Sequence, residues 1–113
     1  MKDILNQIND VPGVKGSIVI DKEGLVVASN LMSGLEEKTI SALVATIYAE
    51  IVKSLAAGRE QEVYGVQLYA NEGSIIFFCA SYCILIVITE PGTNIGLVSI
   101  KMKASIERLM ELL

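Results

Sequence analysis

The feature that most constrains the fold is an almost unbroken apolar run from Ile75 to Ile88. This run is too short for a membrane-spanning helix, which needs about twenty residues. Ser81 and Tyr82 interrupt it near the middle, and its β-branched residues favour strands over a helix. We therefore predict two adjacent strands, paired as a hairpin. Neither half alternates with polar residues, so both faces of the pair must be covered, and helices are the expected cover.

The length and composition bound the remaining possibilities. A chain of 113 residues fits one domain, 1–113, and with 52% hydrophobic and 19% charged residues it is expected to fold. The net charge of −4 argues against nucleic acid as a partner. There is no histidine, and two cysteines are too few for a zinc site, so we expect no metal and no cofactor. No secretory signal is recognised, and a reducing, cytoplasmic location is expected.

The other segments supply two hairpin strands, an edge strand and three helices. A first helix ends at Pro12, strands are predicted at 16–21 and 25–30, and a further strand at 62–70 precedes the apolar hairpin. Asn94 is the predicted cap of a last helix. The order helix, two strands, helix, three strands, helix predicts an α+β fold. It is a three-layer α/β/α sandwich, with the long helix on one face of a five-stranded antiparallel sheet and the terminal helices on the other.

The long helix is predicted over 34–57. Ser33 and Glu36 fit a capping box, and Lys53 and Gly58 are placed to end the helix. Its apolar residues fall in two stripes. The large stripe, expected to cover the sheet, comprises Ile40, Leu43, Val44, Ile47, Ile51 and Leu55. The small stripe, expected to face outward, comprises Ala42, Ala45, Ala49, Val52 and Ala56.

The small stripe has two interpretations. Alanine is a good helix former, so a solvated face could simply be rich in it. An apolar patch of this kind more often marks association, and we favour an interface.

The third strand carries neither charge nor proline between Val63 and Ala70. It is half polar, so it belongs at a sheet edge. Natural sheet edges are normally protected by charged residues or proline, which this strand lacks. An unprotected edge is expected to pair with the identical strand of a second copy about a two-fold axis. The sequence therefore predicts a homodimer.

Catalytic and ligand-binding patterns are weak. Residues 34–39 lack the glycine that a phosphate loop needs before its lysine, and no serine has a histidine to activate it. Cys79 and Cys83 could pair oxidatively, but are more typical of small buried side chains. An aromatic platform for nucleic acid is disfavoured by the acidity, and because Phe77 and Phe78 must point to opposite faces. We expect a protein that is not an enzyme.

Three parts of the chain together resemble the roadblock/dynein light chain domain family: residues 11–29, the Ala-rich helix ending at Gly58, and residues 93–98. The resemblance implies a profilin-like sheet of order 2-1-5-4-3 and a homodimer joined through its third strands. It also implies, for prokaryotic members, binding of a Ras-like small GTPase whose hydrolysis they can accelerate. The partner-binding residues it implies are Ala42, Ala45 and Ala49. The expected dimer interface comprises Val63, Tyr64, Gly65, Val66, Gln67, Leu68 and Tyr69, with Val52 and Ala56.

The favoured hypothesis is a non-enzymatic homodimeric module that binds a Ras-like GTPase and modulates its hydrolysis. If it does so, it acts by positioning the GTPase's own residues, since nothing marks Arg59 or Arg108 as an inserted finger. Two alternatives stay open. One is a structural light-chain or scaffold subunit with no effect on nucleotide turnover, and the other is a small-ligand sensor.

Overall fold

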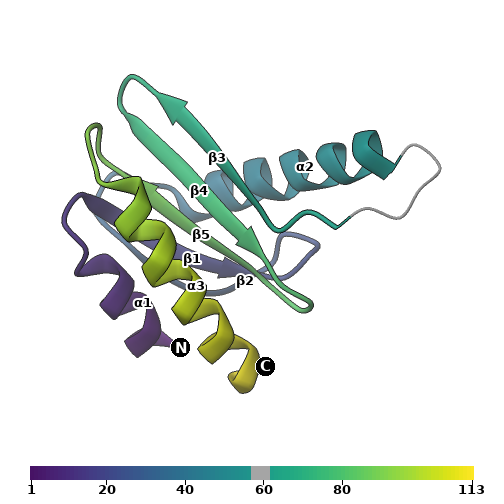
Figure 1. The fold of residues 1–113 in the computed structure, drawn as a ribbon, viewed down its shortest axis with the longest axis horizontal. Coiled ribbons are helices and arrows are strands. Elements are labelled where there is room, and N and C mark those ends of the chain that lie inside the picture. Colours follow the sequence, from purple (N-terminus) through teal and green to yellow (C-terminus); the bar gives the residue numbers. More distant parts are fainter. Residues whose placement is uncertain (57–61) are drawn as a thin grey trace.

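The computed structural model describes residues 1–56 and 62–113 and contains eight elements (Figure 1). Their order is the predicted one. The elements are α1 (Lys2–Asn9), β1 (Val14–Ile20), β2 (Val26–Leu31), α2 (Glu37–Ala56), β3 (Gly65–Ala70), β4 (Gly73–Cys79), β5 (Ile84–Thr89) and α3 (Ile95–Leu112). Within these ranges no helix has both the length and the apolar character needed to cross a bilayer.

The five strands form one antiparallel sheet of order β2-β1-β5-β4-β3, which confirms the expected profilin-like arrangement. The apolar run forms β4 and β5, as predicted. Every residue of β5 is buried, because this strand lies between two neighbours and under helices on both sides. The predicted edge position of the third strand is confirmed, and β2 forms the opposite edge.

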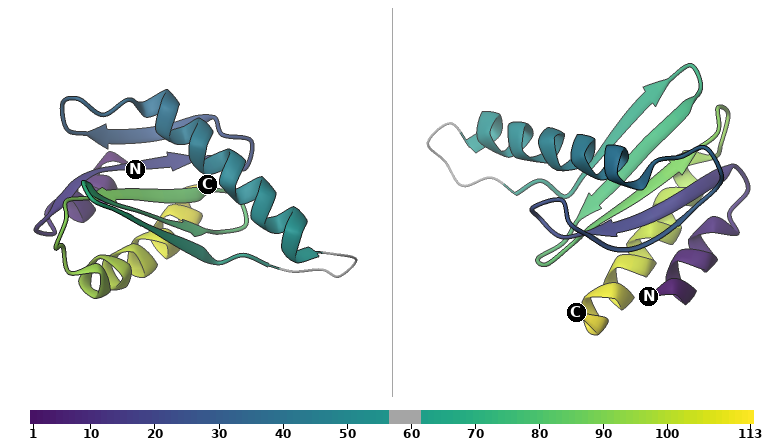
Figure 2. Two further views of the ribbon diagram at one scale, coloured as in Figure 1. Left: turned by 90° about the horizontal axis from the view of Figure 1, so that it is seen from above. Right: turned by 180° about the vertical axis from the view of Figure 1, so that it is seen from behind.

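Helices cover the two faces of the sheet as expected (Figure 2). One hydrophobic cluster joins α1 and α3 to one face, and includes Leu5, Val87 and Met102. The other joins α2 to the opposite face and includes Val44 and Phe77. Phe78 packs against the first cluster, so the two neighbouring phenylalanines do point to opposite faces. Removal of both faces from water is the main driving force for this arrangement.

Two local features hold the ends of these elements. The Asn94 side chain accepts a hydrogen bond from the Leu97 amide at 3.1 Å, which confirms the predicted cap of α3. Gly73 begins β4 with φ of 143°, and a Cβ there would lie 2.0 Å from the Thr89 carbonyl oxygen. Only glycine permits the β3–β4 hairpin to approach the end of β5 this closely.

The predicted start of α2 is wrong. The helix begins at Glu37, and the Glu36 carbonyl accepts its first backbone bond from the Ile40 amide at 3.1 Å. Gly34 has a φ of 92°, a left-handed conformation that cannot belong to a right-handed helix, so Ser33 cannot serve as its cap. Lys53 lies in the last turn, as expected. The predicted closing residue, Gly58, lies outside the described residues.

The predicted sheet-facing stripe of α2 also needs correction. Leu43 was assigned to the sheet but is 47% exposed, whereas Ser41 is buried and Ala45 packs against the core. The helix is rotated because Ala45 fits over Gly24, in the turn between β1 and β2, where a Cβ would lie 3.0 Å from the Ala45 Cβ. The sheet-facing side therefore includes Ser41, Val44, Ala45 and Tyr48, and Ile40 and Ile47 of the predicted stripe also pack against the core.

Candidate interaction surface

The edge strand β3 is exposed along most of its length. Its only strand partner in the described chain is β4, and within that part no side chain forms a hydrogen bond with its backbone. Leu68 is 37% exposed and Tyr69 is 66% exposed, while Tyr64 just before the strand is 73% exposed. The Tyr64 hydroxyl donates to Glu62 at 2.9 Å, and this bond raises the pKa of Tyr64. The unpaired side of β3 is thus an open template for another strand.

The opposite edge, β2, has side-chain contacts from α1. Lys2 Nζ donates to the Ser29 carbonyl at 2.5 Å, and Asn9 Nδ2 donates to the Asn30 carbonyl at 2.9 Å. The Ser29 hydroxyl donates to Glu37 at the start of α2. The Ser29 carbonyl points away from β1, so Lys2 caps one backbone group of this edge, whereas the Asn30 carbonyl faces β1. The β2 edge therefore has one capped backbone group, and β3 has none among the described residues.

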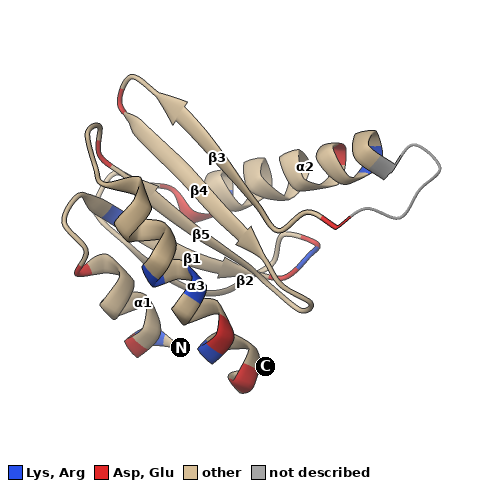
Figure 3. Cartoon of the chain, viewed as in Figure 1, with Lys and Arg blue, Asp and Glu red and all other residues tan. Residues whose placement is uncertain are grey.

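Charge does not distinguish the two edges (Figure 3). Charged residues lie on α1, on α3, in β1, at the turns and toward the two ends of α2, while the edge strands β2 and β3 both have none. An uncharged edge does not repel a second copy of itself. The charge pattern is therefore compatible with self-association at β3.

The C-terminal part of α2 extends beyond the sheet on the side of β3 (Figures 1 and 2). Leu55 follows Tyr48 by seven residues, so it lies on the sheet-facing side of the helix. Its side chain is nevertheless 54% exposed. The prediction that Leu55 covers the sheet is therefore wrong, because this turn of α2 extends beyond the sheet.

The same face of the sheet has an uncovered apolar area near the β3–β4 hairpin. A depression of about 220 Å³ there is lined mainly by apolar atoms of Leu68, Ile75 and Ile88. Thr89 is fully buried at its margin, and its hydroxyl has no hydrogen-bond partner in the described chain. The exposed apolar end of α2 and the uncovered apolar area of the sheet thus lie on the same side of the molecule.

A groove runs between α2 and the β1–β2 turn. Its volume is about 470 Å³, and its lining includes Gly24, Leu25, Ala42 and Thr46. Ser41 also lines it, and its buried hydroxyl has no hydrogen-bond partner among the described residues. Small residues on the helix side leave this groove open to a partner.

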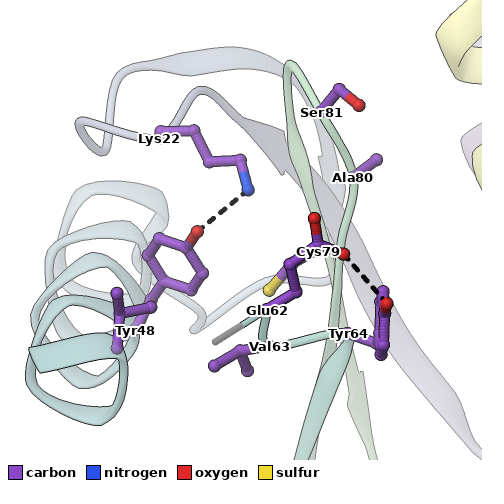
Figure 4. Close-up of a pocket in the computed structure, with 9 residues that line it drawn as sticks. Lys22, Tyr48, Glu62, Val63, Tyr64, Cys79, Ala80 and Ser81 are labelled. Carbon is purple, nitrogen blue, oxygen red and sulfur yellow. Dashed lines mark hydrogen bonds between the residues drawn. The ribbon is translucent and has the colours of Figure 1, made fainter. Parts of the chain in front are cut away.

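A second cavity, of about 290 Å³, lies beneath the C-terminal half of α2 (Figure 4). Lys22 Nζ donates to the Tyr48 hydroxyl at 3.1 Å across its upper side, and Cys79 lies opposite. Burial raises the pKa of Cys79 to about 11, against a smaller opposite effect of the Lys22 charge. The Cys79 thiol is therefore protonated and weakly nucleophilic near neutral pH.

The two cysteines do not form a pair. Both are free, and Cys79 packs on the α2 side of the sheet while Cys83 is buried on the α1 and α3 side. Oxidative pairing, which the sequence left open, would require the β4–β5 turn to rearrange. Residues 1–56 and 62–113 also contain no group of three histidine, cysteine, aspartate or glutamate side chains that could hold a metal ion.

Comparison with known proteins decides the family. The family model of the Roadblock/LC7 domain matches residues 1–89. The chain belongs to the Roadblock/LC7 domain family.

Relatives and solved structures agree with this assignment. Protein MJ1340 of Methanocaldococcus jannaschii is 27% identical over 106 residues, covering 94% of this chain and 93% of its own. A Roadblock/LC7 domain from Streptomyces avermitilis has a TM-score of 0.89 at 13% identity, covering 99% of this chain and 96% of that one. Myxococcus xanthus MglB has a TM-score of 0.88 at 18% identity, with 97% and 91% covered. Schizosaccharomyces pombe profilin shares the fold, with a TM-score of 0.65 at 16% identity and coverages of 98% and 94%.

The residues predicted to bind a partner lie on two different sides of α2 in this Roadblock/LC7 domain. Ala42 and Ala49 are exposed on the outer side of α2, whereas Ala45 is half-buried against the sheet. The predicted dimer residues from Tyr64 to Tyr69 do lie together along the open edge. Val52 instead lines the cavity beneath α2 with Val63, and the Ala56 side chain is outside the described part of the structure.

Several residues of the surface were missed by sequence analysis. Lys2 and Asn9 were assigned no role, yet Lys2 bonds to an outward-facing carbonyl of β2 and Asn9 connects α1 to the Asn30 carbonyl. Lys22 and Tyr48 are 26 residues apart, so no local spacing could have indicated their contact. Neither β2 nor β3 carries a charged residue, so charge did not distinguish the two edges in the sequence.

Proposed function

We propose that this Roadblock/LC7 domain is a non-enzymatic homodimer that binds a Ras-like small GTPase and modulates its GTP hydrolysis. The observation that supports the proposal best is the asymmetry of the sheet edges. Lys2 bonds to an outward-facing carbonyl of β2, while among the described residues no side chain bonds to the backbone of β3. Pairing of β3 with its counterpart about a two-fold axis satisfies the free backbone groups of both copies in one continuous sheet.

The overhang of α2 fits the same two-fold arrangement. The exposed Leu55 turn of one copy extends toward the partner's sheet, next to the uncovered area at Leu68 and Ile75. An isologous contact places each such pair twice in the interface. Burial of these apolar side chains supplies free energy that a bare strand–strand contact would lack. The dimer interface therefore combines β3 with the end of α2.

The GTPase-binding surface in this proposal is the outer side of α2. Ala42 and Ala49 are exposed there, and the groove between α2 and the β1–β2 turn begins beside Ala42. Small side chains permit close approach of a partner's backbone or helix. The two-fold arrangement brings both α2 helices to one face of the dimer, so a single GTPase can contact both copies.

Acceleration of hydrolysis would come from positioning residues of the GTPase. Arg108 of this chain donates to Gln7 at 2.6 Å and belongs to α3, on the opposite side of the sheet from α2. It is therefore poorly placed to serve as an arginine finger at the α2 surface. The GTPase must supply its own water-positioning residue, and this chain restricts the switch conformation around it.

The experiment is a single-turnover GTPase assay with a candidate Ras-like GTPase from the same organism. The wild-type protein is expected to raise the rate, and Ala42→Arg is expected to abolish that effect. Ala104→Arg, an exposed position on α3, is the matched control and should retain it. Binding of the GTPase with no change in rate would support the scaffold alternative, and absence of binding would remove the GTPase from the proposal.

A further inference from the structure

The cavity beneath the C-terminal half of α2 is built from four separate parts of the chain (Figure 4). Lys22 comes from the β1–β2 turn, Tyr48 from α2, Cys79 from the end of β4, and Val63 from the segment before β3. Such convergence of distant segments is typical of a small-molecule site. Its volume of about 290 Å³ equals roughly ten water molecules at about 30 Å³ each. A ligand of comparable size would have roughly ten non-hydrogen atoms.

The polar groups on one wall are hydrogen-bond donors. Lys22 Nζ uses one of its three hydrogens on the Tyr48 hydroxyl at 3.1 Å, which leaves two for a ligand. The Tyr48 hydroxyl accepts that bond and keeps its own hydrogen available for donation. Within the described chain no carboxylate lies close enough to Lys22 for a salt bridge. The pair thus presents a positive charge and several donors, which suit an acceptor group with negative charge.

The rest of the lining suits a compact apolar body. Val52, Val63 and Ala80 contribute aliphatic surface, and the protonated Cys79 thiol behaves as a small hydrophobic group. The carboxylate of Glu62 is the group that would oppose an anion. It lies on the Tyr64 side of the cavity and accepts the Tyr64 hydrogen bond at 2.9 Å (Figure 4). Glu62 is also exposed, so water screens its charge.

We propose that this cavity binds a small carboxylate-bearing molecule with a compact apolar body, held at its carboxylate by Lys22 and Tyr48. The site is separate from the GTPase surface proposed above. A bound ligand would connect α2 to the β1–β2 and β4–β5 turns. In the described chain the hydrogen bond between Lys22 and Tyr48 already joins two of these parts across the cavity. Binding should therefore stabilise the folded protein, by an amount that rises with the logarithm of the ligand concentration once the site is saturated.

Three probes of nearly identical shape test the charge preference: benzoate, the neutral benzamide and the cationic benzamidine. Each is titrated into the full chain and followed by amide chemical shifts. We expect benzoate to bind saturably with shifts at Lys22, Tyr48 and Ala80, and to bind at least about tenfold more tightly than benzamide, as expected for loss of one charge-assisted hydrogen bond. Lys22→Gln should remove this preference for benzoate, and Tyr48→Phe should weaken it.

Lys38→Gln is the matched control, because Lys38 is exposed at the opposite end of α2 and lies outside this cavity. It should leave benzoate binding unchanged. Well-dispersed amide spectra of all variants establish that they are folded. Preference for benzamidine would show that Glu62 dominates and would overturn the proposal. So would benzoate binding that survives Lys22→Gln, or benzoate that causes no saturable shift in the wild type.

Alkylation of Cys79 supplies a second measurement that does not depend on the variants. The thiol lines the cavity, so bound benzoate should slow its reaction with iodoacetamide, as quantified on the Cys79 peptide by mass spectrometry. Cys83 is fully buried on the other side of the sheet and reacts only when the fold opens, so its rate should fall less than that of Cys79. Equal protection of both cysteines would indicate general stabilisation of the fold and would contradict occupation of this cavity.

Discussion

Ala45 of α2 packs directly over Gly24, such that a Cβ on Gly24 would lie 3.0 Å from the Ala45 Cβ. Gly24 also has a φ of 96°, which side-chain-bearing residues rarely adopt. Gly24→Ala should therefore displace α2 as well as strain the turn. We expect it to destabilise the protein by about 2 kcal/mol or more, since left-handed geometry alone costs about 1–2 kcal/mol. Urea unfolding followed by circular dichroism measures the change.

Gly92→Ala separates the two contributions. Gly92 has a φ of 78°, but a Cβ there would meet no atom within 4 Å. Its substitution should show the backbone cost of about 1–2 kcal/mol without the packing cost. Equal destabilisation by the two variants would mean that Gly24 does not set the position of α2.

The same contact explains which part of the fold the sequence could predict. Strand positions follow from runs of apolar residues, and side chains alternate between the two faces along each strand. For this reason β4, β5 and the opposite orientations of Phe77 and Phe78 were predicted correctly. The face that α2 turns to the sheet depends on a glycine in another segment, so periodicity within the helix could not determine it. For the same reason the Lys22–Tyr48 contact was not predictable.

The orientation of α2 also changes the choice of a test substitution. Ala45 belongs to the outward stripe by sequence, but an arginine there would have to displace the sheet-facing packing. Loss of GTPase binding in Ala45→Arg would therefore be confounded by unfolding. Ala42 is exposed and tests the surface without this effect.

Asn9 connects α1 to two strands and should contribute measurably to stability. Its side chain accepts a hydrogen bond from the fully buried Ser17 hydroxyl at 2.8 Å and donates to the Asn30 carbonyl at 2.9 Å. Asn9→Ala removes the closer of two acceptors of Ser17, the other being the Leu5 carbonyl at 3.5 Å. We expect a loss of about 1–3 kcal/mol in the free energy of unfolding. Asn6→Ala, at a more exposed position on the same helix, should cost less, and equal costs would contradict this role of Asn9.

Cys79 makes the stability of the protein depend on alkaline pH. Burial raises its pKa to about 11 from a usual value near 9, so the folded state holds its proton where the unfolded state has lost it. This contribution is complete below pH 9 and is lost as the pH rises from about 9 to about 11. Because the thiol is only half-buried, the loss should be less than the 1.36 kcal/mol per pKa unit, or about 2.7 kcal/mol in total, that a fully shielded group would give.

The measurement compares thermal unfolding of the wild type with that of Cys79→Ala across this range. Other groups also titrate here, so only the difference between the two proteins is informative. The wild type should lose its relative advantage between pH 9 and pH 11. A difference that is independent of pH would show that the Cys79 thiol titrates normally in the folded protein.

The two sheet edges provide the sharpest prediction for self-association. Leu68 on β3 and Val27 on β2 are both partly exposed apolar residues of edge strands, at 37% and 44% exposure. In the proposed dimer Leu68 lies in the interface, so Leu68→Lys places two like charges near the two-fold axis without partners. We expect the dimer dissociation constant to rise about tenfold or more, since even about 1.4 kcal/mol of unfavourable energy has this effect. Val27→Lys adds the same charge to the opposite edge strand, which has no contact in the proposed dimer, and should leave the dimer intact. Sedimentation velocity over a concentration series measures both. Dissociation by Val27→Lys but not by Leu68→Lys would place the interface at the other edge, and a wild type that stays monomeric throughout would refute the dimer itself.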